Sequence, residues 1–131
     1  MKIVAIIPAR AGSKSIKNKN LIQIKKKPLI YYPIKSAKKS NLINRIIVST
    51  DSKKIKKVAE RYGAEVPFLR PKKISGFLSR DIEYIKHCIN WFKKEKYAPD
   101  LIVLLRPTTP FRETKIIDKA IKFVIKYKSD S

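Results

Sequence analysis

The chain has few of the residues that usually form disulfides, metal cages or catalytic triads. It contains one cysteine, Cys88, one histidine, His87, and only 10 acidic residues among 131. A single cysteine excludes an internal disulfide and a thiolate metal cage. With no matched partners in the sequence, Cys88 is expected to be a semi-buried small apolar residue, and His87 a residue that is either solvated or at the edge of the core.

Long apolar runs are also lacking. No stretch approaches the ~20 residues that a membrane-spanning helix needs, so no membrane partner is expected. The apolar residues at the N-terminus are too few for a signal peptide, and Arg10 and Lys14 follow where a cleavage site should lie. They are better explained as the first strand of a cytoplasmic protein.

Negative charge is scarce and positive charge abundant. Lysine and arginine total 32, which gives a net charge of +22. Such a balance is compatible with nucleic-acid binding. The lysines, however, are spread over every predicted helix rather than gathered in one tract, which favours solvated surfaces, so a nucleic-acid partner is not expected. Hydrophobic residues make up 44% of the chain, which argues against disorder.

Three short apolar runs predict buried strands at residues 3–7, 45–48 and 101–105. They lack polar alternation, as parallel strands covered on both faces do. A further short edge strand is expected at 65–69, because Pro67 lies within it.

Helical periodicity separates these runs. A helix is expected from about residue 28 to residue 39, with Pro33 in its first turn. Three more helices are predicted from apolar residues three and four positions apart. Their stripes are Ile55, Val58, Ala59 and Tyr62; Ile82, Ile85, Ile89 and Phe92; and Ile117, Ala120, Ile121 and Val124.

Alternating strands and helices predict an α/β fold with a doubly wound, mostly parallel sheet. Residues 1–131 show no linker and no repeat, so they are expected to form a single domain. Three or four strands are few for such a sheet. We therefore expect the chain to be truncated, lacking the C-terminal portion of the domain.

In open α/β sheets, ligands bind beyond the carboxyl ends of the strands. The segment after the first strand, residues 8–20, is PARAGSKSIKNKN. Backbone N–H groups and cations such as Arg10 and Lys14 suit a loop that wraps a polyphosphate. The spacing matches neither a Walker loop nor a dinucleotide fingerprint, so these residues alone are equally compatible with a basic surface loop.

Two further segments follow strands. In residues 49–52, either Asp51 or Ser52 is expected to cap the next helix. In residues 106–112, two prolines fix a turn that directs Arg106 and two hydroxyls toward the crevice.

Five blocks of the chain, in order, resemble the acylneuraminate cytidylyltransferase family, the CMP-sialic acid synthetases and their relatives. The blocks are residues 7–20, 47–51, 62–66, 68–71 and 105–110. The resemblance covers essentially the whole chain and implies a Rossmann-like fold of nucleotidyltransferase type, with the chain corresponding to the N-terminal part of the family.

The resemblance implies that CTP and a nonulosonic acid give a CMP-sugar and pyrophosphate, with Mg²⁺ as cofactor. It implies a homodimer at full length and metal ligands beyond Ser131. Arg10 and Lys14 would hold the triphosphate and serve catalysis, and Arg106 would lie near the sugar. The implied nucleotide-binding residues are Ala9, Arg10, Ser13, Lys14, Asn20, Arg70, Ser79 and Asp81.

Several residues depart from the family pattern. Ala11 and Ser15 replace frequent glycines, and Phe77 stands where an aspartate is common. Arg106 occupies a position that is often glutamine, which leaves the identity of the sugar substrate open.

Two alternative functions remain at this point. One is another sugar nucleotidyltransferase of the same fold, such as a KDO cytidylyltransferase, against which Lys19 and Asn20 argue. The other is a non-catalytic basic module that binds RNA or DNA.

Overall fold

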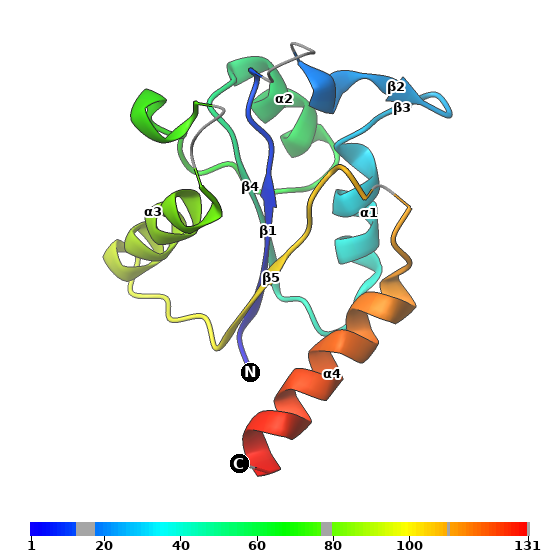
Figure 1. Ribbon diagram of the computed structural model, residues 1–131, viewed down its shortest axis with the longest axis vertical. Helices are drawn as coiled ribbons and strands as arrows, with labels where there is room; N and C mark the ends of the chain where they lie inside the picture. Colours follow the sequence, from blue (N-terminus) through cyan, green and yellow to red (C-terminus); the bar gives the residue numbers. More distant parts are fainter. Residues whose placement is uncertain (13–17, 77–79, 110, 131) are drawn as a thin grey trace.

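The computed structural model describes residues 1–12, 18–76, 80–109 and 111–130, and its centre is a three-stranded parallel sheet (Figure 1). β1 (Ile3–Pro8) lies in the middle, between β4 (Arg45–Ser49) and β5 (Leu101–Leu104). Val4 is opposite Arg45 on one side, and Ile3 is opposite Leu101 on the other. The three strands agree with the predicted runs to within one residue at each end.

Helices cover both faces of this sheet, which explains why the strands show no polar alternation. Ile3, Ala5 and Ile7 of β1 pack with α1 (Tyr31–Lys39), α2 (Lys53–Arg61) and α4 (Thr114–Asp130). Val4 and Ile6 pack with α3 (Asp81–Lys94) on the opposite face. Figure 1 shows α3 at the left of the sheet, with α1 and α4 at the right. The doubly wound α/β fold is confirmed.

A small antiparallel hairpin precedes α1 and was not predicted. It consists of β2 (Gln23–Ile24) and β3 (Lys27–Pro28), after the short 3₁₀ helix η1 (Lys19–Leu21). Its turn residues, Lys25 and Lys26, have φ values of 52° and 69°. Lysine gives no signal for such a turn, which usually takes Gly or Asn. Because the hairpin uses residues 27 and 28, α1 begins at Tyr31 instead of near residue 28; Pro33 lies in its first turn as predicted.

The predicted buried face of α3 is partly wrong. The helix buries Tyr84, Cys88 and Phe92, while Ile82 is 47% exposed. Tyr84 tolerates burial because its hydroxyl donates to Asp81 Oδ1 (3.1 Å). A pattern that counts only aliphatic residues misses this stripe.

The last helix and the predicted edge strand also differ from expectation. In α4, Ile117 and Ile121 are buried, but Ala120 and Val124 are exposed. The strand predicted at 65–69 is reduced to one parallel bridge, between Glu65 and Ile47. Another short 3₁₀ helix, η2 (Lys72–Ile74), follows it.

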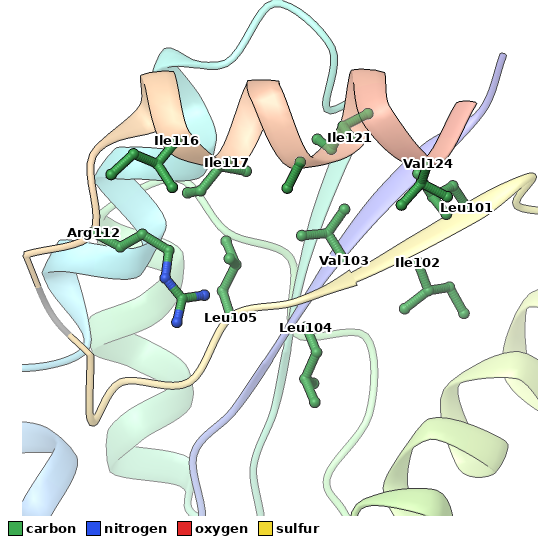
Figure 2. Close-up of a pocket in the computed structure, with 11 residues that line it drawn as sticks. Leu101, Ile102, Val103, Leu104, Leu105, Arg112, Ile116, Ile117, Ile121 and Val124 are labelled. Atoms are coloured by element: carbon green, nitrogen blue, oxygen red, sulfur yellow. The ribbon is translucent and has the colours of Figure 1, made fainter. Parts of the chain in front are cut away.

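An apolar groove of about 370 Å³ runs between β5 and α4, at the edge of the sheet (Figure 2). Residues 101–105 form its floor, and Ile116, Ile117, Ile121 and Val124 project toward it from the helix. Arg112 is the one charged residue of its lining. In the part of the chain that the structure describes, no helix is long and apolar enough to cross a membrane.

Candidate nucleotide site

The carboxyl ends of β1, β4 and β5 meet at one edge of the sheet, and the segments that follow them enclose a polar pocket of about 260 Å³. The pocket is lined by Pro8, Arg10, Arg70, Gly76, Asp81, Tyr84 and Arg106. The fold therefore brings together four of the predicted site residues, and three of them are arginines. Converging guanidinium groups favour a ligand with several negative charges.

The segment after β1 is held to the sheet by backbone hydrogen bonds. Ala9 is buried, and its N–H donates to the Ser49 carbonyl oxygen (2.9 Å). The Asn18 N–H donates to the Ala11 carbonyl (2.8 Å). The Asn20 side-chain amide donates to the Arg10 carbonyl (3.1 Å), so Asn20 supports the residue that lines the pocket. Ser13, Lys14 and Ser79 lie outside the described residues.

Asp51 supports the same loop from β4. Its Oδ1 accepts a hydrogen bond from the Ala11 N–H (2.8 Å), forty residues away in sequence. Ser52 is the N-cap of α2, because its Oγ accepts from the Ile55 N–H (3.2 Å). The predicted cap is thus confirmed for Ser52, and Asp51 has a different role that sequence reasoning missed.

Arg70 forms a fixed positive floor beneath the pocket. It is 5% exposed, and its guanidinium donates to Ser49 twice, from Nε to Oγ (3.0 Å) and from Nη2 to the carbonyl (2.9 Å). It also lies over the Tyr84 ring, 4.7 Å from the centroid. Burial lowers the pKa of Arg70, and burial raises the pKa of Tyr84 to about 12. Arg70 keeps its charge at neutral pH because its ordinary pKa is so high.

Asp81 and Arg106 form an ion pair at the rim. Their side chains are 41% and 50% exposed, so water screens the pair. Asp81 is the first residue of α3, and its other carboxylate oxygen accepts a hydrogen bond from the Tyr84 hydroxyl. The pair links the start of α3 to the segment after β5.

The donor set of the described residues does not fit a magnesium site. Mg²⁺ prefers several oxygen ligands, mostly carboxylate and water. Asp51 and Asp81 are the acids near the described pocket, and each is engaged, by Ala11 and by Arg106. Nowhere in the ranges that the structure describes do three His, Cys, Asp or Glu side chains cluster.

Tyr84 also lines the pocket and was not among the predicted site residues. The only signal was its place three residues after Asp81 and four before Cys88, which puts all three on one helical face. The two residues expected to be structural behave so. Cys88 is fully buried, and burial raises the pKa of its thiol to about 12. The His87 ring packs against Phe68 with centroids 4.4 Å apart, and burial lowers the pKa of the imidazole.

Comparison with known proteins decides the family. A family model described as Cytidylyltransferase matches residues 4–130. The chain belongs to the cytidylyltransferase family. Among curated relatives, the N-acylneuraminate cytidylyltransferase of Escherichia coli is 41% identical over 122 residues, covering 92% of this chain and 28% of the relative. The CMP-N,N'-diacetyllegionaminic acid synthase of Legionella pneumophila is also 41% identical over 122 residues, covering 93% and 53%.

A solved structure shares the fold of this cytidylyltransferase. It is a CMP:2-keto-3-deoxy-manno-octonic acid synthetase complexed with CTP, with a TM-score of 0.80 and 19% identity, covering 96% of this chain and 48% of that one. The chain thus spans about half the length of this structure and of the Legionella relative, and less of the Escherichia one.

Proposed function

We propose that this chain is the nucleotide-binding part of a cytidylyltransferase that transfers CMP from CTP to a nonulosonic acid, with release of pyrophosphate. The convergence of Arg10, Arg70 and Arg106 at the carboxyl edge of the sheet is the observation that carries the proposal. The two most similar relatives reported above are named for CMP transfer to acids of this class, and both match more than nine-tenths of this chain.

The chemistry requires charge neutralisation and positioning more than covalent catalysis. A hydroxyl of the acid attacks the α-phosphorus, the bond to the bridging oxygen breaks, and pyrophosphate leaves with its charge. Arg10 and Lys14 are proposed to neutralise the triphosphate, with Ser13 donating beside them. The hydrogen bonds of Ala9, Arg10 and Ala11 to Ser49, Asn20 and Asp51 support this, because they hold the described start of this segment in place.

The acid substrate is proposed to bind at Arg106. A guanidinium can bind a carboxylate through two parallel hydrogen bonds. The present partner of Arg106 is Asp81 in a half-exposed pair, and such pairs contribute little stability. A substrate carboxylate could therefore replace Asp81 at low cost and leave it free to accept from a cytosine amino group.

Three further proposals follow from the family resemblance. Mg²⁺ is proposed to assist the transfer. A homodimer of the full-length protein and a cytoplasmic location are proposed on the family resemblance alone.

The proposal is tested by isothermal calorimetry with CTP on wild-type protein and on Lys14→Ala. Loss of a charge-assisted phosphate contact should weaken binding by ~1.5–3 kcal/mol. Lys86→Ala removes an equal charge from the exposed face of α3 and serves as the control. Equal affinity for all three proteins would place the triphosphate elsewhere.

Cytidine selectivity is tested separately, by thermal shift with CTP, UTP, GTP and ATP. We expect CTP to raise the melting temperature most, because residues 70–81 are proposed to line the base pocket. Equal shifts with all four nucleotides would remove the cytidine assignment and leave triphosphate binding intact.

The KDO-type alternative has one supporting observation, the fold shared with the 2-keto-3-deoxy-manno-octonic acid synthetase. At 19% identity this likeness shows the fold alone. Assaying the full-length protein with KDO beside nine-carbon acids separates the two candidates, and turnover with KDO only would favour the alternative.

A further inference from the structure

A row of four aromatic rings crosses the face formed by α1, away from the nucleotide pocket. Tyr62 at the end of α2 contacts Tyr31, Tyr31 contacts Tyr32, and Tyr32 contacts Phe111. The successive centroids are 4.9, 5.2 and 5.0 Å apart, all with edge-to-face geometry. The segments that supply them are separated in sequence, and the fold gathers them beside the β2–β3 hairpin at the right of Figure 1.

Cations alternate with these rings. Lys27 Nζ lies 5.3 Å from the Tyr31 centroid and 5.7 Å from that of Tyr62, and Lys25 Nζ lies 5.0 Å from that of Phe111. Two hollows of about 460 and 360 Å³ flank the row. The cations lining them are Lys25, Lys35, Lys38, Lys39, Arg61 and Arg112. Among the described residues that line either hollow, Glu113 is the one acid.

Hydrogen bonds hold this cationic-aromatic face in place. The Tyr32 hydroxyl donates to the Ile24 carbonyl and fastens the hairpin to α1. Ser36 Oγ donates to the Arg112 carbonyl (2.7 Å), and Thr114 Oγ1 donates to the Ser36 carbonyl (2.8 Å). The segment that carries Phe111 is therefore tied to the helix that carries the tyrosines, so the rings and cations are preorganised.

We propose that the cationic-aromatic face binds single-stranded nucleic acid. Successive phosphates match a track of cations, and unpaired bases have faces that can stack on aromatic rings. The even spread of lysine along the sequence argues against a nucleic-acid footprint, but the folded chain gathers seven cations around the four rings. None of the described residues lining the hollows also lines the nucleotide pocket, so this function is separate from CTP binding.

The structure favours a single strand over a duplex or a membrane. A duplex would use the cations but leave the rings without bases to stack on. A membrane surface requires apolar side chains that protrude, and here only Phe111 is largely exposed while the three tyrosines are half-buried between lysines.

The test measures fluorescence anisotropy of a labelled oligouridine of about 10 nucleotides with the full chain, across a range of salt concentrations. One variant carries Lys35→Gln, Lys38→Gln and Lys39→Gln, all exposed on α1. The matched control carries Lys86→Gln, Lys93→Gln and Lys94→Gln, all exposed on α3 across the sheet. Both variants lose three positive charges from exposed helical positions. A difference between their affinities for the oligouridine therefore shows which face of the protein binds it.

We expect the α1 variant to lower the slope of log affinity against log salt by about 2, because single strands release ~0.7 counterions per neutralised phosphate. The control should keep the wild-type slope. Phe111→Ala should weaken binding roughly tenfold with an unchanged slope, as loss of one stacked base would.

Three results would overturn the proposal. Equal weakening of oligouridine binding in both triple variants would mean that the strand is attracted by the overall net charge of +22 and not by this face. Displacement of the oligouridine by excess CTP would place it in the nucleotide pocket. Equal affinity for duplex DNA or phosphatidylserine vesicles, with no effect of Phe111→Ala, would mean that the face recognises charge alone.

Discussion

Asp51 shapes the nucleotide site without lining its pocket. Its carboxylate accepts from the Ala11 N–H and so ties the loop after β1 to the residue that follows β4. An acid beside the proposed phosphate-binding segment would repel an anionic ligand, whereas its carboxylate oxygen holds the Ala11 backbone in place. The two effects change the affinity for CTP in opposite directions, and substitutions at Asp51 can separate them.

We predict that Asp51→Ala weakens CTP binding while Asp51→Asn does not. Alanine removes the acceptor for Ala11, and one lost hydrogen bond of this kind is worth ~1–3 kcal/mol. Asparagine keeps the acceptor and removes the negative charge, so its affinity for CTP should equal or exceed that of the wild type. Calorimetry with CTP on the wild type and the two variants tests this prediction. Equal weakening of CTP binding in both variants would mean that the charge of Asp51, and not its hydrogen bond to Ala11, matters.

Arg70 is a buried charge whose contacts are the hydroxyl and carbonyl of Ser49 and the ring of Tyr84. We predict that Arg70→Lys destabilises the fold by roughly 2–4 kcal/mol, because an ammonium cannot make the forked contact with Ser49 and stays desolvated. Urea unfolding measures the loss. The exposed Arg80→Lys, at the N-cap of α3, should change stability by less than about 0.5 kcal/mol; similar losses in both would contradict the assigned role.

The packing of α3 against the sheet involves two titratable groups. Tyr84 and Cys88 both face the sheet, and burial raises the pKa of each to about 12. Both groups are neutral in the folded protein, and both ionise at lower pH once the chain unfolds. Their contribution to stability is therefore complete below their ordinary pKa values, 9.0 for Cys88 and 10.0 for Tyr84, and is lost as pH rises toward 12.

We predict that the free energy of unfolding falls by about 1.4 kcal/mol per pH unit once Cys88 would ionise in the unfolded chain. The fall should begin near pH 9 and steepen above pH 10, where Tyr84 joins. Cys88→Ala should lack the first part of this fall, although its stability at neutral pH is lower. Urea unfolding across this range tests it, and parallel pH profiles for the two proteins would contradict it.

The strands and the site differ in how far the sequence could predict them. Residues 3–7 form a dense apolar run that only a doubly covered strand satisfies, so their prediction needed no tertiary information. The hairpin turn at Lys25 and Lys26 could not be predicted, because its positive φ angles are imposed by packing against α1. Arg10, Arg70, Asp81 and Arg106 were predicted and meet in one pocket, whereas Tyr84 depends on which face of α3 meets the sheet.

The whole molecule has an open side along β5. One edge of β5 pairs with β1, and the described structure shows no strand on the other. The apolar groove beside it is partly exposed, with Val124 40% and Ile116 56% accessible. Unpaired backbone groups beside an apolar surface favour association of two such edges.

We predict that the 131-residue chain self-associates as salt is raised. A net charge of +22 keeps molecules apart at low ionic strength, and ~0.1 M salt screens it beyond about 10 Å. Val124→Lys places a charge in the groove and should suppress the association, which light scattering measures. Phe123→Lys, one residue away and outside the groove lining, is the control, and equal suppression by both would show that the groove is not the contact.

We also predict that this chain alone does not release pyrophosphate from CTP with Mg²⁺ and a panel of nonulosonic acids. The acids at the described pocket are already engaged, so they offer no set of metal ligands. A coupled pyrophosphate assay tests this, with Lys14→Ala as the background. Release above that background would show that these residues form a complete catalytic set.

The central position of β1 also affects how the chain is made. Of the three sheet strands, β1 is synthesised before its partners: β4 follows some forty residues later, and β5 almost a hundred residues later. At a synthesis rate of about 5–20 residues per second, its second edge waits roughly 5–20 seconds for a partner. During that interval the buried central strand is incompletely paired, so nascent chains should depend on chaperones until Leu101–Leu104 has emerged.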